Sequence, residues 1–225
     1  MTRGILIAGI ESSLSAAIAA EAGKRVEQYA AAFIPNKLAA PLRERAAAQP
    51  AGSGLIPLAW NPGSPISART LVLAAENRLE HIDQAILVCT PPSLRRQAEE
   101  FAPADIDTVV NDHVKSWFFL AKELSAAFKA RNGGTLALVL SDAGTGTEKG
   151  EIPDLMGPSV SASFSAFAGG LLASSVGKPY MTMAFSCGTG EDAAFAAFIF
   201  KILDEGGRRA SGKWLRYGRF SLFGR

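Results

Sequence analysis

The residues that could do chemistry most directly are a serine, an aspartate and a histidine near the middle of the chain. Ser141 and Asp142 follow an apolar run, and His113 lies near the start of a long helix-like pattern. A serine hydroxyl beside a histidine can act as a nucleophile, because the imidazole accepts its proton. The Gly-x-Ser-x-Gly turn is absent, since Val139 and Leu140 precede Ser141. A serine hydrolase is therefore one hypothesis, and a serine that only ends a strand is the simpler interpretation.

Apolar runs alternate with helix-like patterns along the whole chain, and this alternation sets where those side chains would lie. The alternation is typical of a doubly wound, mostly parallel sheet, here with about seven strands. The expected strands are Gly4–Ala8, Gln28–Ile34, Leu55–Trp60, Ala85–Cys89, Thr135–Leu140, Tyr180–Phe185 and Lys213–Tyr217. The expected helices cover 12–21, 35–48, 66–78, 108–131, 158–176 and 192–204. The sequence thus predicts a Rossmann-like, three-layer α/β/α fold in one domain over residues 1–225.

Composition bears on which partners the protein binds and on where it is located in the cell. The formal net charge is +2, and its charges are evenly spread, so we expect no nucleic-acid partner. Cys89 and Cys187 are the only cysteines, which predicts neither a disulfide framework nor a metal centre. The N-terminus lacks the charged-then-apolar order of a signal peptide, so we expect a cytoplasmic protein.

One long stretch, Leu155–Gly177, carries no charged residue. Its length would suit a membrane span, but its serines and glycines are too polar for lipid to be the solvent, so we expect no membrane partner. A helix that packs on the sheet with one side and on a second subunit with the other explains the pattern. A helix buried within its own chain is the alternative.

The order of these segments resembles the short-chain dehydrogenase/reductase family over nearly the whole chain. The segments that carry the resemblance are AGIESSLSAAIAAEA, HIDQAILVC, VVNDHVKSWFFLAKEL, LALVLSDAG, SASFSAFAGGLLASS and SGKWLRYGR, in that order. The resemblance implies a Rossmann fold and descent from NAD(P)-dependent oxidoreductases. It also implies a homodimer or homotetramer, with an interface built from the helices over 108–131 and 158–176.

The cofactor positions implied by the resemblance depart from the family pattern. The family's Thr-Gly-x-x-x-Gly-x-Gly turn lets the backbone approach the dinucleotide phosphates, and only its first glycine is present here. Glu11 adds a negative charge near the expected pyrophosphate, and the family's Asn-Asn-Ala-Gly is replaced by Leu87–Thr90. Trp60 or Asn61 stands where the family has an adenine-contacting aspartate. We therefore expect no resident cofactor and at most weak NAD(P) binding, through Gly9, Ser13, Ser15, Asn61 and Thr90.

The reaction centre departs further. By resemblance, Ser141 matches the family's serine and His113 its asparagine, which makes them the candidate catalytic residues. Val160 and Phe164 stand where the family has a tyrosine acid/base and the lysine that lowers its pKa. The result does not depend on the alignment, because no tyrosine in the sequence is followed four residues later by a lysine. The tyrosines are Tyr29, Tyr180 and Tyr217, and the residues four positions later are Phe33, Ala184 and Ser221.

Three hypotheses follow. The first is a non-catalytic or regulatory relative of these oxidoreductases, which binds a small molecule or works as a scaffold. The second is an unorthodox NAD(P)-dependent oxidoreductase in which Ser141 and His113 orient the substrate and Tyr180 or Lys115 supplies the proton. The third is the serine hydrolase considered above.

Overall fold

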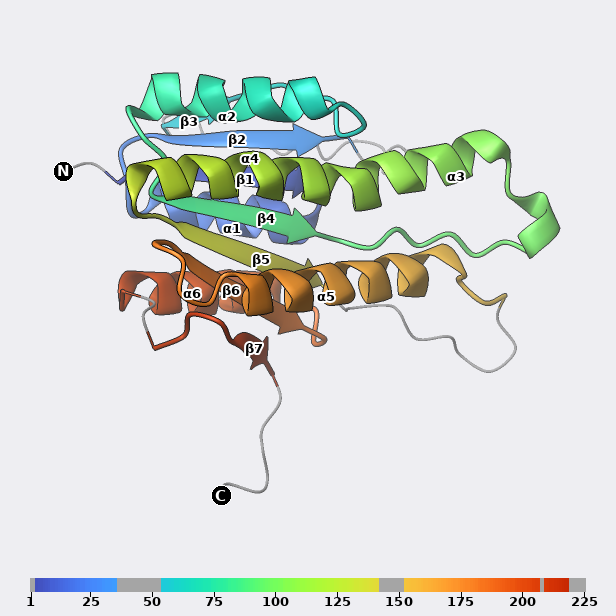
Figure 1. Ribbon diagram of the computed structural model, residues 1–225. Coiled ribbons are helices and arrows are strands. Elements are labelled where there is room, and N and C mark those ends of the chain that lie inside the picture. Colours follow the sequence, from blue (N-terminus) through green and yellow to red (C-terminus); the bar gives the residue numbers. More distant parts are fainter. Residues whose placement is uncertain (1–2, 36–53, 142–151, 207–208, 219–225) are drawn as a thin grey trace.

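A parallel sheet forms the middle layer of the molecule, with helices on both faces (Figure 1). The computed structural model describes residues 3–35, 54–141, 152–206 and 209–218. The sheet has seven strands in the order β3-β2-β1-β4-β5-β6-β7, and every neighbouring pair is parallel. The strands are β1 Ile5–Ile10, β2 Tyr29–Ile34, β3 Leu55–Pro57, β4 Gln84–Cys89, β5 Thr135–Ser141, β6 Met181–Cys187 and β7 Trp214–Tyr217. The predicted Rossmann-like sheet is therefore confirmed, and it is parallel throughout.

The helices divide between the two faces of the sheet. Their bounds are α1 Ser13–Gly23, α2 Pro65–Leu79, η1 Ala98–Glu100, α3 Pro103–Val110, η2 Asn111–Lys115, α4 Ser116–Arg131, α5 Met156–Ser174 and α6 Asp192–Asp204. One buried core joins α2, α4 and α5 to the sheet, and the other joins α1 and α6 to its opposite face. In Figure 1, α3 and η2 continue the line of α4 beyond the end of the strands. No helix within the described ranges is long and apolar enough to cross a membrane.

The central strands form because their apolar runs are buried on both sides. Every residue of β1, β4 and β5 is buried, as expected for a parallel strand covered by helices on both faces. Helix α4 ends at Arg131 and is capped by Asn132, which adopts a left-handed conformation with φ 60°. Position 134, two residues later, requires glycine, because the Cβ of any other residue would lie 2.3 Å from the Phe128 ring.

Two element boundaries differ from the sequence prediction by three or more residues. Strand β3 ends at Pro57 rather than Trp60, because the chain turns at Asn61–Ser64 to begin α2. The long helix begins at Pro103 rather than Thr108, since proline favours the first helical turn. It also contains a π-helical segment, η2, that the residue pattern did not predict. The helix predicted over 35–48 lies almost entirely outside the described residues.

Candidate functional site

The carboxyl ends of β1 and β4 lie side by side at the point where the strand order reverses. Open α/β sheets bind ligands in the crevice at this point. Ser12 caps helix α1 here: its Oγ accepts a hydrogen bond from the Ser15 backbone N–H at 3.1 Å, and Ser15 Oγ accepts one from the Ser12 N–H at 2.9 Å. Thr90, directly after β4, donates its hydroxyl to Ser12 Oγ at 3.1 Å. The candidate residues Ser15 and Thr90 are thus linked through Ser12 across the crevice.

Ser13, the other serine of this turn, is the first residue of α1 and is exposed. The first N–H groups of a helix have no partner within the helix, and the helix dipole adds positive character. The Ser15 N–H is already satisfied by Ser12, so the N–H groups of Ser13 and Leu14 remain for an anion. Glu11 is exposed beside them.

Gly9 is required by the sheet itself. It pairs with Val88 of β4, and a Cβ on Gly9 would lie 2.5 Å from the Val88 carbonyl oxygen and 3.0 Å from the Val88 Cβ. The oxygen belongs to a buried strand and cannot move aside at low cost. Packing between strands therefore explains this glycine without a cofactor.

We expect Gly9→Ala to lower the free energy of unfolding by about 2 kcal/mol in the absence of any nucleotide, because the added methyl overpacks two central strands. Gly188→Ala is the matched control, since a Cβ there meets nothing within 4 Å. It should change stability by less than about 0.5 kcal/mol. Urea denaturation of both variants tests this, and equal stabilities would contradict the packing argument.

Asn61 does not present its side-chain oxygen to the crevice. Its Oδ1 accepts a hydrogen bond from the Gly63 N–H at 3.0 Å, and its own N–H donates to Ser67 Oγ at 2.7 Å. The neighbouring Trp60 packs against the core of the α2, α4 and α5 face. Asn61 thus shapes the turn that begins α2.

Ser141 is the last residue of β5, and its Cα pairs with that of Cys187 at the end of β6. Cys187 in turn pairs with Tyr217 at the end of β7. The connection from β6 to α6 is a tight turn over Gly188–Glu191, so little chain is available to cover the edge on this side.

Tyr180, considered above as a proton donor, lies at the wrong end of the sheet. It precedes β6, whereas Ser141 pairs with the last residue of that strand. Seven residues of parallel strand span about 20 Å, so Tyr180 cannot reach Ser141. Lys115 is exposed and donates to Asn111 Oδ1 at 3.0 Å. Tyr180 therefore cannot be the acid that the second hypothesis needs, and Lys115 is engaged with Asn111.

His113 lies in the π-helical segment η2 and is buried, with 2% of its surface exposed. The segment widens because the Ser116 N–H bonds to the Asn111 carbonyl, while Ser116 Oγ donates to the Asp112 carbonyl at 2.7 Å. Single π-helical turns often mark functional positions. Burial lowers the pKa of His113 to about 4, so the imidazole is neutral at pH 7. Its Nδ1 has no hydrogen-bond partner in the part of the chain described.

No hydrogen bond joins His113 to Ser141 among the described residues. A serine nucleophile and its histidine base would normally be in hydrogen-bond contact. The two residues therefore stand as separate features of the site, one at the end of β5 and one in η2.

The two positions implied for the tyrosine and lysine of the resembling family are inside the core. Val160 and Phe164 of α5 are 2% and 1% exposed. The Phe164 ring meets the Trp117 ring of α4 edge-on, at 5.7 Å between centroids and an interplanar angle of 81°. This wall of the site is therefore apolar and closed by packing.

The loop after β4 is hydrogen-bonded to the residue that caps the start of α5. Asp154 Oδ1 accepts hydrogen bonds from the N–H groups of Met156 and Gly157, and its Oδ2 accepts one from the Leu94 N–H at 3.3 Å. Leu94 is buried in the same core as Val160. A side chain at Gly157 would lie 2.6 Å from the Pro92 carbonyl oxygen. Sequence reasoning missed this contact, because it joins segments about 60 residues apart.

Sequence comparison finds no relative: no protein-family model matches the chain, and no curated protein matches it. Comparison of structures finds many similar folds. A short-chain type dehydrogenase/reductase from Mycobacterium marinum has a TM-score of 0.76 at 14% identity, covering 95% of this chain and 92% of that one. A short-chain dehydrogenase/reductase from Serratia marcescens has a TM-score of 0.72 at 16% identity, covering 95% of each chain.

The chain has the short-chain dehydrogenase/reductase fold. A further protein with this fold, an NADH-dependent reductase solved in complex with NAD, has a TM-score of 0.70 at 17% identity and covers 96% of this chain and 94% of that one. The fold resemblance predicted from the order of segments is therefore confirmed over almost the full length.

The residues at the crevice fit one end of a dinucleotide better than the other. The start of α1 offers the N–H groups of Ser13 and Leu14 to a phosphate, which is the feature that anion sites at helix N-termini share. At the other end, buried Phe164 offers no charge or hydrogen bond to a ribose. Within the described ranges, no three potential metal ligands gather.

Proposed function

We propose that this protein is a non-catalytic relative of NAD(P)-dependent short-chain oxidoreductases that binds a small molecule at the carboxyl edge of its sheet. The observation that carries the proposal is the burial of Val160 and Phe164, which replace a proton donor and a ribose-binding cation with hydrocarbon. Neither side chain can transfer a proton. In the sequence, no tyrosine is followed four residues later by a lysine that could replace them.

A dinucleotide is the ligand class that the fold favours, held weakly through its phosphates. The N–H groups at the start of α1 support phosphate binding, while the carboxylate of Glu11 opposes it. The hydroxyls of Ser12 and Thr90 already bond to each other, so a ligand must compete with that contact.

Calorimetric titration with NAD(H) and NADP(H), together with an activity screen over alcohols and carbonyl compounds, tests the proposal. We expect weak, saturable binding and no turnover. Ser13→Asp is the informative variant, because an acid in the first turn stabilises a helix while it repels a phosphate. Binding should therefore be lost in Ser13→Asp with thermal stability kept. Oxidation or reduction of any substrate in the screen would overturn the non-catalytic assignment.

The second candidate is an unorthodox oxidoreductase, and the buried neutral imidazole of His113 is the observation that favours it. A neutral imidazole can both donate and accept a hydrogen bond, and its Nδ1 is unsatisfied in the described part of the chain. If the screen finds turnover, His113→Ala and Ser141→Ala should each lower kcat/KM by at least tenfold.

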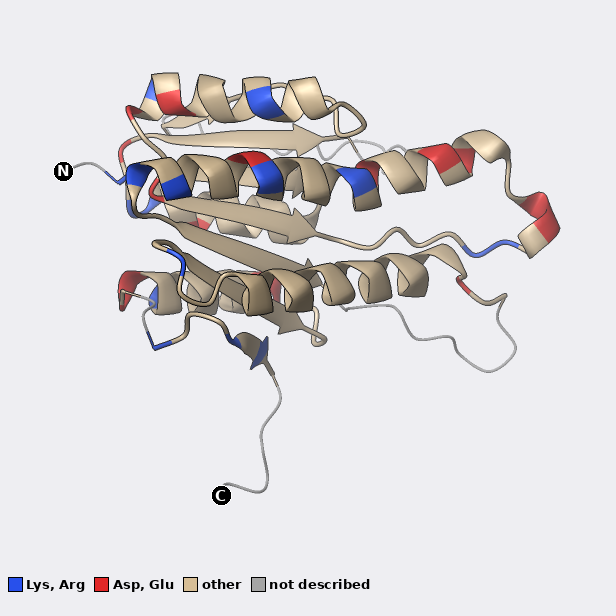
Figure 2. Cartoon of the chain, viewed as in Figure 1, with Lys and Arg blue, Asp and Glu red and all other residues tan. Residues whose placement is uncertain are grey.

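We further propose that the protein is a homo-oligomer that pairs through α4 and α5. Helix α5 carries no charge over its whole length, which Figure 2 shows as an uninterrupted tan helix. Its outer face is exposed, and a Cβ at Gly169 or Gly170 would meet nothing of the chain's own within 4 Å. Glycine inside a helix costs up to about 1 kcal/mol relative to alanine, and close approach of a second helix explains the pair. Phe118 of α4, 54% exposed and 4.6 Å from the Phe167 ring, extends this apolar face.

Ala166→Glu on the outer face of α5 should convert the oligomer to monomers, because it buries an unpaired carboxylate between subunits. Ala197→Glu places the same charge on the exposed side of α6, on the other face of the sheet, and should leave the assembly intact. Light scattering after size exclusion reads the mass of each. A monomeric wild-type protein, or dissociation by both variants, would contradict the proposed interface.

A further inference from the structure

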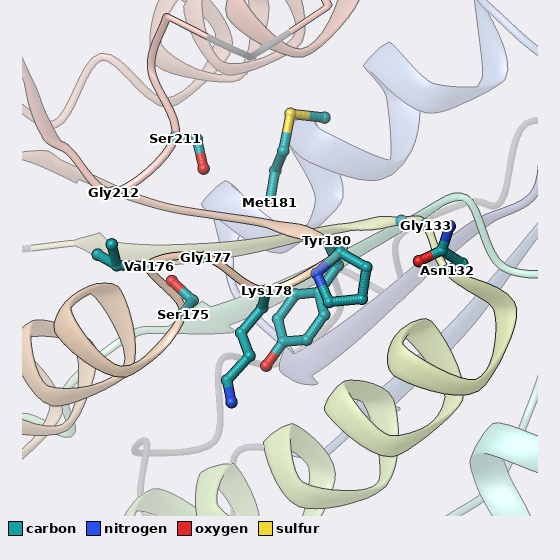
Figure 3. A pocket seen from close by; sticks show the side chains of 12 residues that line it. Asn132, Gly133, Ser175, Val176, Gly177, Lys178, Tyr180, Met181, Ser211 and Gly212 are labelled. Atoms are coloured by element: carbon teal, nitrogen blue, oxygen red, sulfur yellow. The ribbon is translucent and has the colours of Figure 1, made fainter.

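A cavity of about 550 Å³ opens at the amino end of the sheet. Three connections line it: Asn132–Gly134 between α4 and β5, Ser175–Tyr180 between α5 and β6, and Ser211–Gly212 before β7 (Figure 3). The carboxyl edge with Ser141 and Cys187 lies at the other end of the strands, about 20 Å away. The cavity is therefore separate from the crevice where the proposed dinucleotide would bind.

The apolar part of the cavity is held firmly. The Tyr180 ring packs against Phe128, with 6.1 Å between the ring centroids, and the positive-φ turn at Gly134 lies against the same Phe128 ring. Val176 at the rim is 78% exposed, whereas the Met181 side chain turns to the other face of the sheet and packs against the core of α1 and α6. A fixed aromatic floor with an exposed aliphatic rim suits the body of a small ring compound.

The polar part of the cavity is cationic. Lys178 lines it and has no ion-pair partner in the described part of the chain, while Arg131 nearby is held by Asp83 at 2.9 Å. In the view of Figure 3, the Lys178 ammonium and the Tyr180 hydroxyl extend in the same direction. Arg209 and Lys213 flank the lining residues of the third connection, are exposed, and form no ion pair with any described residue.

The backbone of the cavity is already hydrogen-bonded. The Lys178 N–H donates to the Ser175 carbonyl at 3.0 Å, the Met181 N–H to the Gly134 carbonyl at 2.9 Å, and the Gly212 N–H to the Thr182 carbonyl at 2.8 Å. A phosphate site is typically a nest of free backbone N–H groups, which these bonds do not leave. A carboxylate needs fewer donors, and one ammonium with one hydroxyl can hold it.

We propose that this cavity binds a small aromatic carboxylate, with its carboxylate on Lys178 and Tyr180 and its ring against Tyr180 and Val176. The volume lies within the range of small-molecule sites, about 300–1,000 Å³. The proposal is independent of the dinucleotide, because the two sites share no residue.

Benzoate is the probe, followed by amide NMR of the wild-type protein. We expect saturable shifts of the amide signals of Gly133, Gly177 and Gly212, one from each connection, with smaller shifts from benzamide, which has the same ring without the charge. Lys178→Gln should weaken benzoate binding by roughly tenfold, since it removes a charge-assisted hydrogen bond. Lys122→Gln, on the exposed side of α4 away from the cavity, is the control and should bind as wild type.

Absence of saturable benzoate shifts at these glycines would overturn the proposal. So would equal shifts from benzamide, or unchanged affinity in Lys178→Gln. None of these outcomes bears on the dinucleotide titration, which reports on the start of α1.

Discussion

Phe164→Lys is expected to unfold the protein rather than to restore a cofactor-binding lysine. Phe164 is 1% exposed, and its ring packs edge-on against Trp117 between α4 and α5. An ammonium there would lose its hydration and find no counter-ion in an apolar core, and the lost ring contacts would add to the cost. We expect a loss of more than about 4 kcal/mol in the free energy of unfolding.

Two variants separate burial of charge from the other effects of the change. Phe164→Leu keeps the site apolar and should cost only about 1–2 kcal/mol. Ala197→Lys adds the same ammonium to an exposed helix position on the other face of the sheet and should change stability by less than about 0.5 kcal/mol. Urea denaturation followed by circular dichroism measures all three. A Phe164→Lys protein as stable as wild type would mean that this position faces an open cleft, and it would remove the main support for the non-catalytic proposal.

The sheet could be predicted because each central strand has its own signal in the local sequence. The buried runs of β1, β4 and β5 are apolar at every or nearly every position, and each is followed by a helix pattern of its own. The loss of the tyrosine–lysine pair was also readable from the sequence alone, since it is a property of residue types. The Ser12–Ser15 capping box has a visible signal too, a serine three residues before another at the start of a helix.

The contacts that shape the site could not be predicted in the same way. The hydrogen bond from the Leu94 N–H to Asp154 joins two loops whose proximity depends on the whole fold. The π-helical segment forms because the Ser116 N–H bonds to the Asn111 carbonyl while the Ser116 hydroxyl bonds to the Asp112 carbonyl. A serine within a helix does not require that arrangement, so the sequence does not predict it. Tyr180 was misplaced although it begins the predicted strand Tyr180–Phe185, and the first residue of a parallel strand lies at the amino end of the sheet.

His113 is expected to make the stability of the protein fall as the pH falls from 6.5 to 4. The pKa of its imidazole is lowered by burial from 6.5 to about 4. Above pH 6.5 the imidazole is neutral in both the folded and the unfolded chain, so burial of His113 takes nothing from the free energy of unfolding there. Between pH 6.5 and 4 the unfolded chain takes up a proton that the folded chain does not. The free energy of unfolding therefore declines by up to about 3 kcal/mol.

The difference between wild type and His113→Asn isolates this contribution, because every other titratable residue is common to both proteins. Denaturation midpoints at pH 7, 5.5 and 4.5 should show the wild type losing stability faster than His113→Asn as the pH falls. His81→Asn is the control, since His81 is partly exposed beside Asp83 at 3.2 Å, and this variant should retain the steep decline. Parallel pH profiles for wild type and His113→Asn would mean that the imidazole is hydrated or paired in the folded protein. In that case it could not present an unsatisfied Nδ1 to a ligand, and the oxidoreductase alternative would lose its supporting observation.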